Sequence, residues 1–279
     1  MTPPQLTDRT ALNRHRTRAL ALAEPALFLQ EEAVLDVQER LAAVNRRFTD
    51  LVVVTGFPAL WQAAFPRARV VADAPALDLP PASQDLIIHA MALHWADDPV
   101  GQLVQCRQAL RPDGLLLATF FGGQTLHELR AVLAEAETAA TGGLSPRVLP
   151  MGEIREVGAL LSRAGFALPV ADAAPRHVTY RDLFHLMSDL RAMGETNALA
   201  ARLRRPTGRE VFLRAAALYA QNYPADGGRI AATFEVICLT GWCPHESQQK
   251  PLRPGSAAQR LADALNATEH RLSGGPPDR

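Results

Sequence analysis

The sequence predicts an α/β protein built on a parallel sheet, and two observations carry this prediction. Short apolar runs recur along the chain up to Phe121, and they alternate with longer stretches in which apolar residues have helical spacing. The runs are apolar at nearly every position, which is typical of strands that helices cover on both faces. The 279 residues, of which 48% are hydrophobic, suffice for one large domain or two small ones.

Helices are expected first. Between residues 26 and 48 the apolar side chains keep to one stripe at three- and four-residue spacing, so we interpret residues 1–48 as an N-terminal helical arm. After the arm, strands alternate with helices, as in parallel sheets with right-handed crossovers. The expected elements are a strand at 51–55, a short helix at 58–65, strands at 69–72 and 85–90, a helix at 99–110 and a strand at 115–121.

The pattern changes after Phe121, where helices outnumber strands. Helices are expected at 124–140, 151–164, 182–193 and 209–223, weaker strands at 170–173 and 178–180, and a late strand at 231–241. We interpret residues 49–258 as one α/β domain with a helical insertion at about 181–225, before its last strand. The polar tail, 259–279, contains Gly-Gly-Pro-Pro and is expected to be disordered.

Composition excludes several classes of function. With 29 basic and 29 acidic residues the formal net charge is zero, so no overall field attracts nucleic acid. The three cysteines form no C-x-x-C pair, which favours a reducing cytoplasm, and no apolar run approaches the roughly 20 residues of a membrane span. We therefore expect a cytoplasmic bacterial protein. Its Arg-rich N-terminus lacks the serine enrichment of a transit peptide and is interpreted as mature protein.

Several short motifs distributed over most of the chain are shared with a known family. They are Asp8-Arg9 with Arg14, Arg16, Arg18 and Ala19; Leu93-His94-Trp95 with Asp98; Leu110-Arg111-Pro112-Asp113-Gly114; Phe121-Gly122-Gly123 with Thr125, Leu126, Glu128, Leu129 and Arg130; Gly142-Gly143-Leu144-Ser145-Pro146; Asp189-Leu190, Met193-Gly194-Glu195 and Asn197; and Gly241-Trp242, His245, Ser247-Gln248, Pro251 and Gly255-Ser256.

On these motifs the chain resembles the class I S-adenosylmethionine-dependent methyltransferases, and more narrowly the family of respiratory complex I assembly factors that includes the mitochondrial protein-arginine hydroxylase. A strand after Arg-Pro-Asp-Gly occurs in many methyltransferases, whereas the last three clusters lie outside that common core and make the narrower match specific. The resemblance implies a Rossmann-like class I methyltransferase fold, and a respiratory complex I subunit as protein partner.

The half of such a fold that holds the cofactor is degenerate and shortened here. The resemblance implies a Gly-x-Gly turn after the first strand, but residues 55–59 read Thr-Gly-Phe-Pro-Ala, with Gly56 as the one remaining glycine. Asp73 could accept hydrogen bonds from the ribose, and Asp78 is expected either to face the adenine or to mark only a turn. About thirty residues separate Thr55 from Asp85, too few for two further strand-helix units, so one strand and one helix are expected to be missing.

S-adenosylmethionine is therefore expected at a degenerate site, if it binds at all. The candidates for cofactor binding lie at the carboxyl ends of the predicted strands, where open α/β sheets bind ligands. They are Gly56, Asp73, Asp78, His94 and Trp95.

The candidates for contact with a substrate or partner come from the later motifs. They are Phe121, Gly122, Gly123, Thr125, Glu195, Asn197, Trp242, His245, Ser247 and Gln248. Paired glycines at a strand end allow a ligand close to the backbone. The proline-rich stretch from Trp242 onwards is expected to lack regular structure, and either to fold over the sheet as a lid or to meet a partner. An arginine-bearing substrate would need carboxylates or stacking faces, which Trp242, Glu195 and Glu246 could supply.

Three functions remain open from the sequence. The resemblance implies assembly or modification of respiratory complex I, with hydroxylation of an arginine on an iron-sulfur subunit as one form of it. The alternatives are a non-catalytic assembly chaperone with a decayed cofactor pocket, and an active methyltransferase on a small molecule or carrier-bound acid. Hydroxylation calls for oxygen activation, normally by iron, but neither His89, His94 and Asp97 nor the late cysteines with His245 make a convincing ligand set. No metal site and no catalytic residue are predicted.

Overall fold

The computed structural model describes residues 5–249. The chain divides into two compact units, Met1–His245 and Glu246–Arg279, and every helix and strand of the described residues belongs to the first. The tail predicted to be disordered, 259–279, lies outside the described residues, as do Pro251, Gly255 and Ser256 of the last motif.

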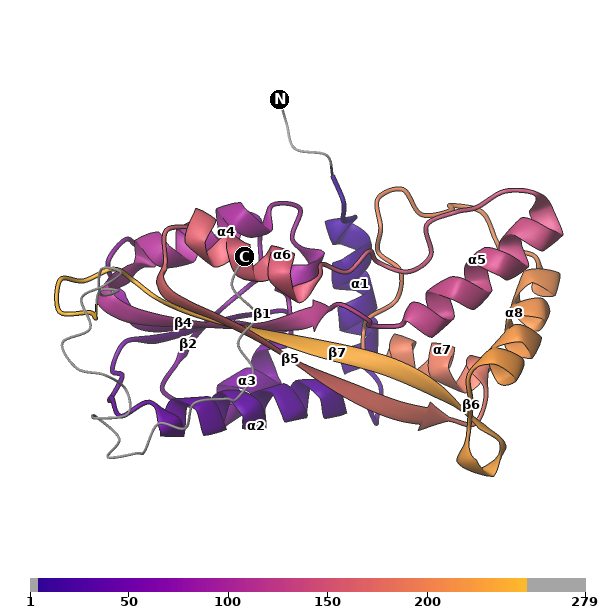
Figure 1. Ribbon diagram of the computed structural model, residues 1–279, viewed down its shortest axis with the longest axis horizontal. Helices are drawn as coiled ribbons and strands as arrows, with labels where there is room; N and C mark the ends of the chain where they lie inside the picture. The colour runs from indigo at the N-terminus through magenta and orange to yellow at the C-terminus, as the bar shows by residue number, and fades with distance from the viewer. Residues whose placement is uncertain (1–4, 250–279) are drawn as a thin grey trace, which may run out of the picture. The chain divides into compact units, whose positions relative to one another are not determined.

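A seven-stranded mixed sheet forms the centre of the first unit, with the strand order β2-β1-β3-β4-β7-β5 and β6 paired to β7 (Figure 1). The first four strands of that order are parallel, and β7 runs antiparallel to both of its neighbours. The Rossmann-like α/β fold is thereby confirmed. The strands are β1 (Leu51–Thr55), β2 (Arg69–Val71), β3 (Gln84–Ala90), β4 (Leu110–Gly122), β5 (Ala167–Tyr180), β6 (Pro224–Ala225) and β7 (Arg229–Trp242).

Helices cover both faces of the sheet, which explains why the predicted strands are apolar throughout. In β1, Val53 faces one core together with Val37 of α2, whereas Val52 and Val54 face the other together with Leu103 of α4. Successive side chains of a strand point to opposite faces, so a strand between two helical layers needs apolar residues at every position. Figure 1 shows α2 and α3 on one face and α4 and α6 on the other.

A third group of helices packs on the long extension of β5 and β7, beyond the parallel strands (Figure 1). Leu129 of α5, Leu186 of α7 and Tyr219 of α8 share a core with Ile230 and Phe234 of β7. The helices are α1 (Arg9–Leu20), α2 (Phe28–Ala43), α3 (Pro58–Ala64), the short η1 (Leu93–Trp95), α4 (Pro99–Ala109), α5 (His127–Thr141), α6 (Ile154–Arg163), α7 (Leu183–Ala192), α8 (Arg209–Asn222) and the short η2 (Asp226–Gly228).

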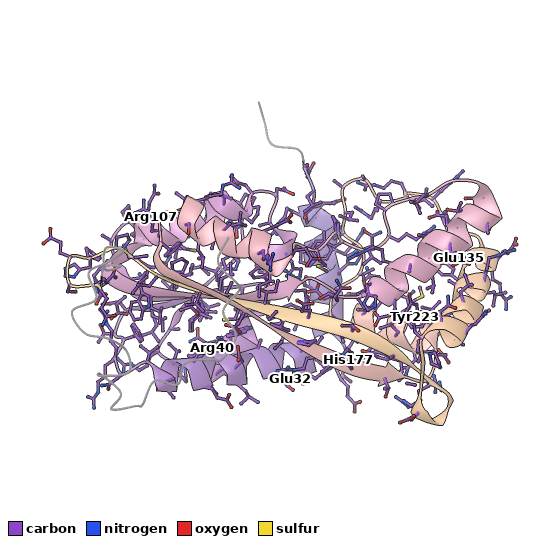
Figure 2. All side chains as sticks on the ribbon, in the orientation of Figure 1. Glu32, Arg40, Arg107, Glu135, His177 and Tyr223 are labelled. Atoms are coloured by element: carbon purple, nitrogen blue, oxygen red, sulfur yellow. The ribbon has the colours of Figure 1, made fainter. Side chains whose placement is uncertain are left out.

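The edge strand β5 differs from the sequence prediction. Two weak strands at 170–173 and 178–180 were expected, but one strand of 14 residues pairs with β7 along most of its length. Its side chains are largely exposed or half-buried, so the apolar signal is diluted, and Pro175 is tolerated because an outer strand has one unpaired side. Arg40 of α2, labelled in Figure 2, reaches this strand. It forms two hydrogen bonds to Asp172, at 2.6 and 2.7 Å.

The connection from β2 to β3 is short. Between Val71 and Gln84 the described chain contains no helix and no strand, in line with the expected loss of one strand and one helix. The edge strand β2 therefore returns to β3, on the other side of β1, through an irregular segment. None of the helices over residues 5–249 is long and apolar enough to cross a membrane.

Candidate functional site

The carboxyl ends of the parallel strands carry two distinct regions. One, which we call the cofactor edge, consists of Thr55 at the end of β1, Gly56 and Phe57 directly after it, and Asp73 after β2. The other, which we call the apolar pocket, lies where η1 and the end of β4 meet α5, α7 and the loop after α7. Ligands of open α/β sheets bind at these strand ends, so either region is a candidate site.

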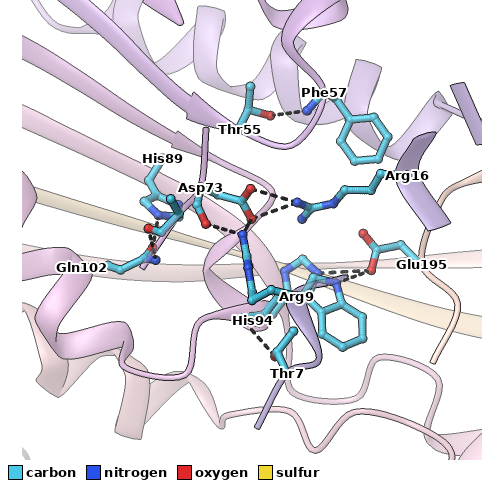
Figure 3. A network of polar contacts seen from close by, with 12 residues as sticks. Thr7, Arg9, Arg16, Thr55, Phe57, Asp73, His89, His94, Gln102 and Glu195 are labelled. Carbon is cyan, nitrogen blue, oxygen red and sulfur yellow. Dashed lines mark hydrogen bonds and ion pairs between the residues drawn. The ribbon is translucent and has the colours of Figure 1, made fainter. Parts of the chain in front are cut away.

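At the cofactor edge, Asp73 is already held by two arginines of the same chain. The Arg16 guanidinium donates through Nη1 to both carboxylate oxygens at 2.9 Å, and its side chain is only 4% exposed. Arg9 lies 3.2 Å from Oδ2 of Asp73 and also donates to the backbone carbonyl of the same residue. Figure 3 shows both guanidinium groups converging on the Asp73 carboxylate. Helix α1, which carries the two arginines, therefore closes over this end of the sheet.

The same guanidinium lies against Gly56. A Cβ atom on Gly56 would be 2.3 Å from Nη1 of Arg16, so the glycine is needed for this close approach. Phe57, in the place of a loop glycine, has its ring centroid 5.7 Å from Cζ of Arg16, within cation–π range. The backbone N–H of Phe57 donates to Oγ1 of Thr55 at 3.1 Å, which fixes the turn. The turn is thus built around an arginine side chain.

S-adenosylmethionine, which the fold family implies, does not fit this edge as it stands. Asp73, the acid that would accept the ribose hydroxyls, is occupied by Arg16, and the face of Gly56 that a cofactor would approach is covered by the same side chain. A cavity of about 340 Å³ remains here, and Arg16 itself is part of its wall. Asp78, the candidate for the adenine position, has an 85% exposed side chain and pairs with Arg69.

The segment before α1 is fastened to the same edge. Oδ1 of Asp97 accepts hydrogen bonds from the backbone N–H groups of Leu6 and Thr7, both at 2.8 Å. The N–H of Asp8 donates to the carbonyl of Ala198 at 2.7 Å, and the Asp8 carboxylate accepts from Ala11 in the first turn of α1 at 3.0 Å. The position of α1, and with it that of Arg16, is therefore set by several independent contacts.

The apolar pocket has a volume of about 190 Å³ and brings together several residues that the sequence singled out. Its lining includes six of them, namely His94, Trp95, Phe121, Thr125, Glu195 and Asn197. The His94 and Phe121 rings lie 5.1 Å apart between centroids, and Phe121 lies 6.0 Å from Phe234 of β7. One part of the wall is therefore aromatic, and aliphatic side chains form most of the rest. Glu195 is the buried acid of the pocket, and Arg147 and Arg191 also line it.

Glu195 lies in the loop after α7 and is held by two neighbours. Its Oε2 accepts from the Trp95 indole at 2.7 Å and lies 3.3 Å from Nε2 of His94 (Figure 3). The side chain of Glu195 is only 10% exposed. Its Oε1 is buried and has no hydrogen-bond partner among residues 5–249. Gly194 makes the tight turn before it at φ +79°, and a Cβ there would be 3.2 Å from Cα of Arg16.

The environment keeps Glu195 ionised. Burial by itself would raise the pKa of the carboxyl, but the charge and hydrogen bond of His94, the charge of Arg16 and the Trp95 indole together lower the pKa below its ordinary value. A charged carboxylate with one unpaired oxygen, inside a pocket with aromatic walls, attracts a cation that can donate hydrogen bonds.

The paired glycines after β4 have structural reasons to be there. A Cβ on Gly122 would be 2.3 Å from Cδ1 of Ile237, and Gly123, at φ +49°, would place one 2.4 Å from the Glu235 carboxylate. The Thr125 hydroxyl donates to the carbonyl of Gly122 at 2.8 Å and tightens the same turn. A role of these residues in substrate contact stays a prediction.

Trp242 lies at the opposite end of the sheet from the pocket. It is the last residue of β7, where it pairs with Leu115, near the start of the parallel strand β4. Its ring lies 5.8 Å from Cζ of Arg46. The expectation of irregular structure is therefore wrong at this residue, and Trp242 cannot line the apolar pocket. Contact of Trp242, His245, Ser247 and Gln248 with a partner stays a prediction.

Two further buried side chains near the strand ends are those of His89 and Arg16. His89 is fully buried and hydrogen-bonded to Gln102 at 2.7 Å, and the described residues contain no group of three or more His, Cys, Asp or Glu side chains that could hold a metal. Arg16 lies in one of the shared motifs, but no role is predicted for it from the sequence. A signal was present, because Leu12, Arg16 and Ala19 share the buried face of α1 at helical spacing, where a charged residue needs a partner.

Comparison with known proteins gives the following matches. A family model described as a methyltransferase domain matches residues 36–118. The mitochondrial arginine-hydroxylase NDUFAF5 of Rattus norvegicus is 38% identical over 75% of this chain and 61% of its own length. The protein of the same name from Dictyostelium discoideum is 43% identical over 65% of this chain and 42% of its own length. A malonyl-[acyl-carrier protein] O-methyltransferase of Xylella fastidiosa is 38% identical over 64% of this chain and 58% of its own length.

The match thus spans less than two thirds of the length of these relatives. Among solved structures, the YcgJ protein of Bacillus subtilis is 11% identical, with a TM-score of 0.48 over 76% of this chain and 98% of that chain. The prediction of a cytoplasmic location is contradicted, because the NDUFAF5 relatives are named as mitochondrial proteins. The cysteine content indicated a reducing compartment, but it does not distinguish one such compartment from another.

Proposed function

Since this chain belongs to the class I methyltransferase superfamily and is a relative of the NDUFAF5 arginine hydroxylases, we propose that it acts in the assembly or modification of respiratory complex I by binding an arginine side chain of a subunit. The observation that carries the proposal is the Glu195 carboxylate in the apolar pocket, ionised, nine-tenths buried and with Oε1 unpaired among the described residues. The guanidinium group is the protein cation that matches it best.

The chemistry of the pocket matches a guanidinium group in two ways. Guanidinium is planar and donates several hydrogen bonds in a fixed fork, so it pairs well with a carboxylate oxygen held in place by other donors. It also stacks on aromatic faces, and Phe121 and Phe234 supply such faces at the pocket. An ionised carboxylate buried without a full set of partners is costly, and an incoming cation relieves that cost.

The size of the pocket favours one side chain over a whole cofactor. Its volume of about 190 Å³ is smaller than the roughly 300–1,000 Å³ of typical small-molecule sites. A substrate arginine projecting from a protein surface would therefore enter, while the rest of the partner stays outside. Hydroxylation of that arginine is the modification that the relatives' name supports. The pocket would contribute binding and orientation to such a reaction.

A non-catalytic assembly chaperone is the second candidate, because Arg16 fills the edge where a cofactor would act. The same pocket would then grip the arginine without changing it. A methyltransferase on a carrier-bound malonyl group is the third candidate, and the carboxylate of that substrate would meet Glu195 but also Arg147 and Arg191, which line the same pocket.

The proposal is tested by titrating the protein with a short arginine-containing peptide in a calorimeter, beside the same peptide with citrulline, a neutral analogue of arginine. We expect the arginine peptide to bind at least about tenfold more tightly, and the Glu195→Gln variant to lose that preference, since a hydrogen bond to a charged group contributes roughly 1.5–3 kcal/mol. Glu135→Gln on the exposed face of α5 is the matched control and should bind as the wild type does (Figure 2). Equal affinity for both peptides would refute the proposal.

A further inference from the structure

We propose that Arg16 is a permanent internal occupant of the cofactor edge, and that this protein therefore works without S-adenosylmethionine. In this view, the guanidinium group takes the place that the methyltransferase fold reserves for its cofactor. The inference concerns the cofactor edge and does not depend on what the apolar pocket binds.

The two groups that would recognise the cofactor are satisfied by Arg16. Nη1 bridges both oxygens of Asp73 at 2.9 Å, and the guanidinium covers Gly56 so closely that a single methyl group would collide with it. Asp73 and Arg16 are about 95% buried, so separating them would leave the Arg16 guanidinium unpaired and Asp73 with Arg9 as its one remaining arginine partner. A bound cofactor would have to offset that loss before it made any contact of its own.

Helix α1 is built into the fold and is not poised to swing away. The segment before it pairs with the 198–200 loop through Asp8 and Leu6, and Asp97 holds two of its backbone N–H groups. The carboxylate of Asp8 both caps α1 and pairs with Arg202 at 2.8 Å. Removing Arg16 from Asp73 by a movement of α1 would break all of these contacts together.

The residues that depart from a methyltransferase loop fit one another. Phe57 stands where a cofactor loop would have a small residue, and its ring receives the Arg16 guanidinium at 5.7 Å. Gly194 keeps a Cβ away from the backbone of Arg16 and from the edge of the Phe57 ring, at 3.2 and 3.4 Å. A site that had only decayed would not be expected to retain such complementary packing.

The occupied edge also supports the neighbouring pocket. The positive charge of Arg16 is one of the groups that lower the pKa of Glu195. The guanidinium therefore contributes on two sides, by neutralising Asp73 and by stabilising the ionised form of Glu195. A cofactor that displaced Arg16 would weaken the charge on which the pocket depends.

The first test needs only the wild-type protein. We expect calorimetry and thermal shift to detect no binding of S-adenosylmethionine or S-adenosylhomocysteine at about 1 mM, because a ligand that binds the native state must raise its stability. Saturable binding of either compound would overturn the proposal, since it would mean that Arg16 yields to the cofactor.

The second test removes the Arg16 side chain by substitution and supplies methylguanidinium in solution in its place. Arg16→Ala leaves a buried carboxylate next to an arginine-shaped cavity, so its midpoint of thermal unfolding should fall by roughly 5 °C or more. Methylguanidinium at millimolar concentration should restore part of that loss in Arg16→Ala only. The matched control is Arg14→Ala, at an exposed position on the same helix. Its midpoint of thermal unfolding should stay at the wild-type value, and methylguanidinium should change that midpoint no more than it does in the wild type.

An equal response of the two variants to methylguanidinium would overturn the assignment of Arg16 as an occupant held by Asp73. If Arg16→Ala does not fold, Arg16→Met takes its place, because the methionine side chain keeps apolar volume at the site but removes the charge and the donors that Asp73 accepts from. The wild-type titration remains decisive in either case.

Discussion

The cofactor edge and the apolar pocket lie side by side at the carboxyl ends of the same sheet, but they differ in how their buried charges are satisfied. Asp73 has both oxygens paired with arginines of its own chain. Glu195 has one oxygen paired and the other without a partner in the part of the chain that the structure describes. In the first region the acceptor is already used by the chain's own arginines, although a cavity of about 340 Å³ remains and Nε and Nη2 of Arg16 have no partner among the described residues. In the second region the acceptor itself is available to a ligand.

This difference supports the proposal that ligand binding in this protein takes place at the apolar pocket. In the methyltransferase fold the glycine turn and the acid after the second strand serve the cofactor. Here the corresponding residues, Gly56 and Asp73, serve to seat Arg16, and the open site is formed by residues outside the shared core, such as Glu195. The apolar pocket lies on the same sheet, but Gly56 and Asp73 of the cofactor edge are not part of its lining.

The largest effect should come from breaking the filled edge. Arg16→Met should lower the free energy of unfolding by about 3–5 kcal/mol, because it leaves Asp73 buried with a single, partly exposed arginine. Adding Asp73→Asn to the same variant should recover part of that loss, since the uncompensated charge is gone. Denaturant unfolding measures both. If the double variant were less stable than the single one, the contribution of the ion pair would have been misjudged.

An ion pair beside the apolar pocket should make the stability of the protein depend on pH. Two hydrogen bonds from Arg147, together with those from Ser145, hold the pKa of Glu137 at about 2, although burial opposes the shift. Because the pKa is lowered in the folded state, the stabilisation is complete above the ordinary value of 4.5 and is lost as the pH falls towards 2.

Glu137→Gln should therefore lower the free energy of unfolding by about 2–3 kcal/mol at neutral pH. It should also make the free energy of unfolding depend less on pH between about pH 4.5 and 2. Glu137 holds Arg147, and Arg147 and Leu149 line the apolar pocket. The affinity for the arginine peptide should therefore fall as well. Glu135→Gln is the control. An acid unfolding curve that keeps its wild-type slope in Glu137→Gln would contradict the assignment.

A smaller change tests whether the glycine turn exists for Arg16. Gly56→Ala should cost about 1–3 kcal/mol, because the new methyl group would lie 2.3 Å from a guanidinium that is fixed by Asp73. In the Arg16→Met background the same substitution should cost much less, since the unbranched methionine can move aside. Equal costs in the two backgrounds would show that Gly56 is required for some other reason.

The smallest effect is expected at the far end of the sheet. Trp242→Ala should reduce stability through lost packing around Arg46, but it should change arginine-peptide affinity less than about twofold, because Trp242 lies away from the pocket. Calorimetry on the purified variant checks this. A large loss of affinity would mean that the late motif reaches the bound peptide, as its sequence first suggested.

Much of the fold was readable from the sequence, because local patterns report directly on burial. The run at 51–55 and its neighbours predicted strands with two buried faces, and α4 begins at Pro99 and ends before Pro112, as expected. The edge strand β5 was read poorly, since a strand exposed along much of its length has little apolar signal. Of the predicted site residues, His94 and Trp95, expected at the cofactor, lie together with Phe121 and Glu195, expected at the substrate, while Trp242 lies elsewhere; their roles stay predictions.

The sequence by itself determined the class of the fold, the shortened first half and the residue types that gather at the strand ends. These follow from periodicity, turn chemistry and the spacing of motifs along the chain. Only the tertiary structure decided that Arg16 covers Gly56 and pairs with Asp73, and that Oε1 of Glu195 in the apolar pocket has no hydrogen-bond partner among the described residues. Partners of buried charges are chosen in space, between segments 57 and 100 residues apart, and no local pattern records such a choice.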